Sequence, residues 1–106
     1  MTRRAILVLA AALAIAVVAA QGVVAPETSG LGGDLFALVH QPGWDRPRAL
    51  NSSGRAGSNA DGSALAAQGL RDIPADDPLV VTVPGCVDGL LTLSREFGRL
   101  PFGDTL

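Results

Sequence analysis

An uninterrupted apolar run near the start of the chain is the feature that most constrains its fold. Residues 5–20 are all Ala, Ile, Leu or Val, and Arg3 and Arg4 precede them. Charged residues, an apolar segment and small residues at Val18–Ala20, in that order, are typical of a secretory signal. As a helix the run rises only about 24 Å, which is short for a membrane span. An Ala-rich helix buried on all sides in a larger protein fits the same pattern.

Both interpretations place a boundary after residue 20. They separate an apolar segment, residues 1–20, from a body, residues 21–106. If residues 1–20 are a signal or anchor, the protein is exported, periplasmic or attached to a membrane through residues 5–20. If they form a buried helix, a cytoplasmic location is expected. All 13 glycines and all 7 prolines lie in the body, which is therefore rich in loops.

Charge and cysteine content exclude several classes of protein. The net charge is −2 and lysine is absent, which excludes a basic nucleic-acid binder that works by neutralising phosphates. A single cysteine excludes an internal disulfide framework, and one cysteine with one histidine is too few for a structural zinc site. We expect no metal and no cofactor.

The body predicts a mixture of strands and helices, an α+β fold. A hairpin is expected because a mostly apolar run and a short return strand flank a turn that contains Pro-Gly. The best helix carries apolar residues at helical spacing and is followed by a glycine suited to the left-handed conformation and by a proline. The expected strands are 35–40, 49–50 and 79–83, the last of them buried, with a further strand start at 22–25; the expected helices are 64–70, closed by Gly69, and 86–97, followed by Gly98 and Pro101.

Most chemistry-bearing residues of the body have a structural interpretation. The glycine turn at 30–33 lacks the pattern of a phosphate or dinucleotide loop and predicts a tight turn with positive φ. His40 is expected to be a polar residue at a strand end. Cys86 could have a lowered thiol pKa at a helix start, but without a partner base it is expected to be a packing residue. The carboxylates at 72–77 predict a solvated loop, and Asn51-Ser52-Ser53 is a formal glycosylation site.

Arg55 is the remaining candidate for a binding function. It lies in a flexible polar loop directly after the predicted hairpin. Arginine presents a rigid fork that can hold a carboxylate through two parallel hydrogen bonds. From the local sequence alone, we expect an exposed arginine without a ligand.

Three segments, read in order, resemble the γ-glutamyltransferase family, also called glutathione hydrolases. Residues 22–40 resemble the family's Val-Val-x-Pro…Ser-Gly-x-Gly-Gly-x-x-Phe segment. Residues 48–56 resemble its arginine-bearing loop after a strand hairpin. Residues 80–106 resemble its Val-Pro-Gly-x-Val-x-Gly segment, which is followed by Tyr/Phe-Gly-x-Leu-Pro. Three motifs in the right order are far more specific than one.

The resemblance implies an N-terminal-nucleophile hydrolase fold, an αββα sandwich that is incomplete in this chain. It implies a precursor that cuts itself, after which a new N-terminal threonine takes up the γ-glutamyl group of glutathione-type substrates. Arg55 matches the arginine that holds the glutamyl α-carboxylate. The expected partners are that substrate and the missing small-subunit portion of the same enzyme, so residues 1–106 alone should be inactive and hold no catalytic residue.

The chain also departs from the family pattern. Asp34 stands where many members have a third glycine, and Gly57 follows Arg55-Ala56 where a proline is usual. No threonine of the chain resembles the self-cleavage site. Residues 13–25 fall where the family has an Ala-rich internal helix, which supports the buried-helix interpretation of the apolar run. The alternative from a different class is a small exported or anchored protein that acts by binding or structure.

Overall fold

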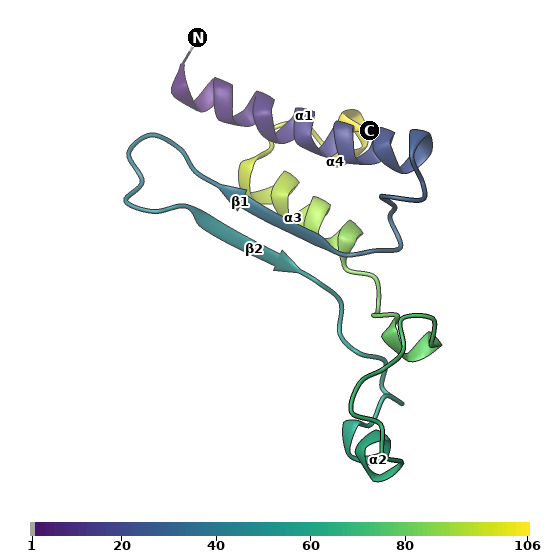
Figure 1. Ribbon diagram of the computed structural model, residues 1–106. Coiled ribbons are helices and arrows are strands. Elements are labelled where there is room, and N and C mark those ends of the chain that lie inside the picture. Colours follow the sequence, from purple (N-terminus) through teal and green to yellow (C-terminus); the bar gives the residue numbers. More distant parts are fainter. Residues whose placement is uncertain (1) are drawn as a thin grey trace.

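The computed structural model describes residues 2–106 and consists of two packed helices, a β-hairpin and an extended excursion, residues 56–81. In chain order the elements are α1 (Arg3–Val24), β1 (Leu35–Val39), β2 (Arg48–Ser52), α2 (Gly62–Ala67), a 3-10 turn (Pro78–Val80), α3 (Cys86–Phe97) and α4 (Phe102–Thr105). In Figure 1, α1 and α3 lie beside the hairpin, while α2 lies far from them. The α+β class is therefore consistent with the structure.

The apolar run forms one continuous helix, α1. The Thr2 side chain caps its start by accepting a hydrogen bond from the Ala5 amide at 3.3 Å. The helix ends at Val24 because Ala25 precedes Pro26, and a residue before proline is disfavoured in the α region. The predicted strand start at residues 22–25 is therefore wrong. Among the described residues, none of the helices is long and apolar enough to cross a membrane.

The predicted hairpin is confirmed, with a longer return strand than expected. β1 and β2 pair antiparallel, from Leu35 opposite Ser52 to Val39 opposite Arg48. Gly43 in the connecting turn has φ of +97°, a conformation that favours glycine. Trp44 in this turn lies 6.2 Å from the Phe97 ring, and the Arg48 guanidinium lies 4.6 Å from the centre of the Trp44 ring. This stack fastens the turn to the end of α3.

The core lies where α1, the hairpin and α3 meet. Ile15 and Leu90 are each only 1% exposed, and Leu35 and Cys86 complete the buried cluster. Gly89 allows α3 to approach the sheet, because a Cβ there would lie 2.8 Å from the Ser52 Cβ. The predicted helix at 86–97 is confirmed in both its bounds. Gly98 after it has φ of −77°, so its expected left-handed conformation is wrong.

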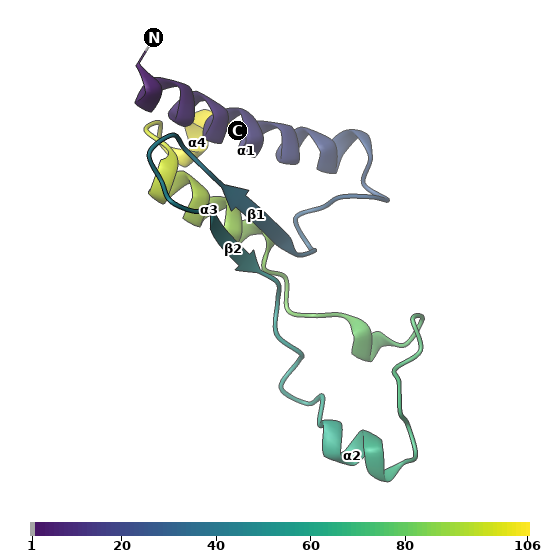
Figure 2. The same ribbon diagram turned by 60° about the vertical axis from the view of Figure 1, so that its left-hand side comes forward.

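The predicted strand at 79–83 is wrong. Pro78–Val80 form a 3-10 turn whose start is capped by Asp77, and the chain then runs without secondary structure to Gly85. Val81 and Val83 are 68% and 55% exposed. A strand needs a neighbour that supplies a hydrogen-bond ladder, and in the described part of the chain the only sheet is the two-stranded hairpin. Figure 2 shows this segment leading from the excursion that carries α2 back to the start of α3.

Candidate functional site

The loop that carries Arg55 leaves the hairpin at a firmly anchored point. Ser52, the last residue of β2, is 9% exposed, and its hydroxyl donates a hydrogen bond to the Gly85 carbonyl at 2.7 Å. Gly85 and Cys86 in turn donate their amides to the Gly33 carbonyl at 3.1 and 2.9 Å. The start of α3, the end of β2 and the glycine turn before β1 are thus joined at one place.

Asp34 is the centre of this arrangement. Its Oδ1 accepts hydrogen bonds from the Gly54 amide at 3.0 Å and the Thr82 hydroxyl at 3.1 Å, and its Oδ2 accepts one from the Ser53 hydroxyl at 3.2 Å. The Gly54 amide lowers the pKa of the Asp34 carboxyl below its ordinary value, and the two hydroxyls act in the same direction against desolvation. Because the folded-state pKa lies below the unfolded one, this carboxylate stabilises the fold above the ordinary carboxyl range. That contribution is lost as the pH falls through the folded-state pKa.

Arg55 directly follows Ser53 and Gly54, which are bound to Asp34. Its backbone is also held by the segment before α3. The Arg55 carbonyl accepts a hydrogen bond from the Val83 amide at 2.8 Å. The two segments touch so closely at Gly54 that a Cβ there would overlap the Val83 carbonyl oxygen. The backbone of Arg55 is therefore fixed, while its side chain is exposed.

An open cavity of about 680 Å³ lies in front of the Arg55 loop. It is formed by the loop after β2, by the segment before α3 and by the first turn of α3; its polar lining includes Asn51, Ser53, Arg55, Ser58 and Asp88. The cavity thus combines the Arg55 guanidinium with hydroxyl and amide groups and with the carboxylate of Asp88 at its α3 side. Such a surface can hold a small polar molecule that carries a carboxylate.

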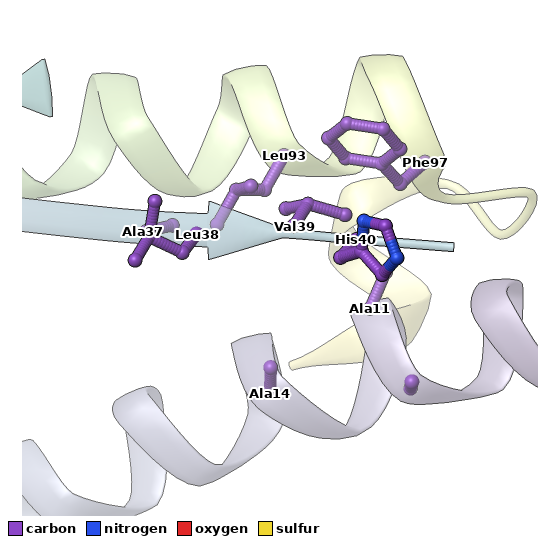
Figure 3. A pocket seen from close by; sticks show the side chains of 9 residues that line it. Ala11, Ala14, Ala37, Leu38, Val39, His40, Leu93 and Phe97 are labelled. Carbon is purple, nitrogen blue, oxygen red and sulfur yellow. The ribbon is translucent and has the colours of Figure 1, made fainter. Parts of the chain in front are cut away.

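A second cavity, of about 260 Å³, lies between α1, β1 and α3 and contains His40. Figure 3 shows His40 at the end of β1, between Phe97 of α3 and Ala11 of α1. The remaining lining is apolar, from alanines of α1, from Ala37–Val39 and from Leu93. His40 has no acid or nucleophile beside it in this lining, so the structure supports its interpretation as a polar residue at a strand end.

The surroundings of the other candidate residues indicate structural roles. Cys86 is 3% exposed, and burial raises the pKa of its thiol, with a further contribution from the negative charge of Asp34. The expectation that Cys86 is a packing residue is therefore supported. The Asn51 side chain accepts a hydrogen bond from the Ser53 amide at 2.9 Å and shapes the Arg55 loop. The acidic loop at 72–77 is mostly exposed, and no cluster of metal-binding side chains occurs within residues 2–106.

The glycine turn differs from its prediction. The glycines with positive φ in the described chain are Gly43 and Gly69, so those at 30–33 are not required for that conformation. Gly69 follows the end of α2 with positive φ, as expected, although the helix spans Gly62–Ala67 and not the predicted 64–70. The contribution of the turn is instead the Gly33 carbonyl and the adjacent Asp34. The sequence signal for Asp34 is its departure from the family's glycine, which does not indicate its role in the structure.

Comparisons with known proteins agree with these motifs. The model of the gamma-glutamyltranspeptidase family matches residues 10–106. The glutathione hydrolase-like YwrD proenzyme of Bacillus subtilis is 36% identical over 93 residues, which are 88% of this chain and 18% of that protein. The oxamate amidohydrolase proenzyme of Klebsiella pneumoniae is 44% identical over 86 residues, 77% of this chain and 16% of that protein. Human glutathione hydrolase 7 is 32% identical over 93 residues, 88% of this chain and 13% of that protein.

The chain belongs to the γ-glutamyltranspeptidase family, because the family's pattern extends over most of its length. It spans 13–18% of the length of these curated relatives.

Proposed function

We propose that this chain forms part of the substrate-binding portion of a γ-glutamyltransferase-type enzyme, in which Arg55 binds the carboxylate of the substrate. The observation that carries the proposal is the fixed backbone of Arg55 beside an open polar cavity, with its guanidinium exposed. An arginine placed in this way needs only a ligand carboxylate to form two parallel hydrogen bonds. The transferred or hydrolysed group is a γ-glutamyl group of the glutathione type.

The nucleophile of this enzyme is an N-terminal threonine that lies outside residues 1–106. The hydroxyls of Thr28 and Thr105 donate hydrogen bonds to the nearby carbonyls of Ala25 and Pro101, and the Thr82 hydroxyl donates one to the carboxylate of Asp34. These hydrogen bonds support structural roles for the three hydroxyls. The partner that completes the site is therefore the remaining portion of the same enzyme, and residues 1–106 alone are inactive.

The apolar run is an internal helix of this enzyme in our proposal. The family match begins at residue 10, within α1, and continues without interruption through the body. Ile15 of α1 is 1% exposed, and Val18 packs against the same core. A cleaved signal would remove both contacts. The exposed outer face of β1, with Phe36 and Leu38 at 67% and 77%, supports the proposal that a further layer completes an αββα sandwich.

A second substrate class has specific support. One relative is named as an oxamate amidohydrolase, and its 44% identity exceeds that of the glutathione hydrolases reported above. Oxamate and a γ-glutamyl amide share a carboxylate and a scissile amide, so Arg55 would serve both. The substrate lengths differ greatly, which makes a direct comparison of the two informative.

The test uses the enzyme that combines this chain with its nucleophile-bearing portion. Arg55→Ala should lower kcat/KM for a γ-glutamyl anilide at least roughly tenfold, which corresponds to about 1.4 kcal/mol. Arg55→Lys keeps the charge but loses the fork, so it should also weaken recognition. Self-cleavage should survive in both variants because it involves no substrate carboxylate.

Arg71→Ala is the matched control, since Arg71 is exposed and lies in the excursion away from the cavity. The same variants assayed with oxamate identify the preferred substrate class. Unchanged kinetics of Arg55→Ala with both substrates would leave Arg55 a surface residue and overturn its proposed role.

A further inference from the structure

We propose that Asp34 is a positioning residue for substrate recognition, because its carboxylate ties the Arg55 loop to the segment before α3 and thereby sets where the guanidinium stands. This inference rests on the proposed role of Arg55. It adds a residue that is distant in sequence and lies outside the lining of the Arg55 cavity.

The first support is the number and origin of the donors on one carboxylate. Gly54 and Ser53 precede Arg55 in the loop, whereas Thr82 lies in the segment that leads to α3. Asp34 therefore joins two segments whose contact points are 20 and 48 residues away from it along the chain. All three donors are neutral groups, so a carboxylate, which only accepts hydrogen bonds, suits them all.

The second support is that the hydrogen bonds of Asp34 act next to Arg55 itself. On one side of Arg55, the Gly54 amide is bound to Asp34; on the other, the Arg55 carbonyl is bound to the Val83 amide at 2.8 Å. Thr82, the neighbour of Val83, is bound to the same Asp34 oxygen as Gly54. Asp34 thus holds both of the loop segments whose contact fixes Arg55.

The consequence for binding is preorganisation. A free loop must be ordered before an arginine can form two parallel hydrogen bonds, and this ordering weakens binding. With Asp34 in place, the ordering is already complete before the substrate arrives. Loss of Asp34 should therefore raise KM through Arg55, while the chemistry at the threonine nucleophile changes less.

The test is a double-mutant cycle in the complete, self-processed enzyme, with a γ-glutamyl anilide as the probe. Asp34→Ala should raise KM roughly tenfold and change kcat less than about threefold. Asp34→Asn keeps Oδ1, the acceptor of Gly54 and Thr82, and should restore KM to within about threefold of the original. In an Arg55→Ala background, Asp34→Ala should add less than about twofold, because the residue it positions is gone.

Two controls separate positioning from general stability. Asp72→Ala removes an exposed carboxylate of the excursion and should leave KM unchanged. Thr82→Val removes one hydroxyl that donates to Asp34, with little change in side-chain shape. It should raise KM about two- to fivefold, even if Asp34→Ala fails to fold.

The outcomes distinguish the two proposals. If Arg55→Ala weakens recognition but Asp34→Ala does not, or if their effects on KM multiply independently, the positioning role is overturned and the role of Arg55 stands. If Arg55→Ala itself leaves KM unchanged, both are overturned. A KM increase in Asp34→Ala that disappears in the Arg55→Ala background supports the inference.

Discussion

The packed unit of α1, the hairpin and α3 differs sharply from the excursion at residues 56–81, although both contain leucine, isoleucine and valine. In the packed unit Ile15 and Leu90 are 1% exposed. In the excursion no residue of α2 or of the 3-10 turn is buried, and Val80 and Val81 are 42% and 68% exposed. Figure 2 shows the excursion extending away from the helices and the hairpin.

Apolar residues in a sequence are therefore not buried by their composition alone. A side chain leaves water only where another element offers a complementary surface, and the excursion has no such neighbour in the described chain. Arg55 lies at the junction of the two regions, with β2 on one side and the excursion on the other. Its position therefore depends on how firmly the excursion is fastened to the packed unit.

The largest effect should come from the core. Leu90→Ala removes a fully buried side chain of the packed unit and should destabilise the chain by about 2–5 kcal/mol, because it loses burial and leaves a cavity. Val81→Ala, the matched change in the excursion, should stay within about 0.5 kcal/mol. Urea denaturation followed by far-UV circular dichroism and by Trp44 fluorescence measures both. Equal losses in the free energy of unfolding would mean that the excursion is packed in solution, and would contradict the difference between the two regions.

A smaller effect is expected where the two regions are joined. Gly54→Ala places a Cβ against the Val83 carbonyl and should cost about 1–3 kcal/mol, since backbone atoms must move apart. Gly57→Ala, two residues beyond Arg55, meets nothing within 4 Å and should be neutral or stabilise the chain by up to about 1 kcal/mol. Hydrogen exchange of the Val83 amide should become faster only in the first variant. If both variants behave alike, the close contact at Gly54 is not present in solution.

The smallest effect concerns Cys86, which belongs to the core and whose amide is bound to Gly33, the residue before Asp34. Its thiol should react with iodoacetamide at least roughly tenfold more slowly in the folded chain than in urea, because it is buried and its pKa is raised. Asp34→Asn removes a charge that contributes to the raised pKa, so the folded-state rate should increase about two- to threefold. The rate should rise with pH as the thiolate forms. A folded chain that reacts as fast as the unfolded one would show that the start of α3 is open.

Local sequence patterns predicted the elements whose stability is largely local. The helix at 86–97 has apolar residues at helical spacing, and it was predicted with both of its bounds correct. The hairpin was predicted from its turn, although β2 is longer than the two-residue return strand expected. The run at 79–83 was assigned as a buried strand on composition alone. That assignment was wrong because a strand is defined by its neighbour, which a local pattern does not contain.

The candidate site was predicted only in part. Arg55 was selected from the family resemblance and its loop, and the structure places it beside an open polar cavity; its role remains a prediction. Asp34 was noticed only as a departure from the family's glycine. Its hydrogen bonds to Ser53, Gly54 and Thr82 join residues 19, 20 and 48 positions away. No local periodicity reports contacts at such separations.

Residue identity and local pattern were sufficient to assign the γ-glutamyltranspeptidase family, the hairpin and the helix of residues 86–97. These depend on residue identity and on interactions between neighbours a few positions apart. Which apolar residues are buried, and the hydrogen bonds by which Asp34 holds the loop of Arg55, are visible only in the folded structure. The physical reason is that burial and long-range hydrogen bonds exist only after distant segments have been brought together, and the cost of closing those loops is met by the packing of the whole unit.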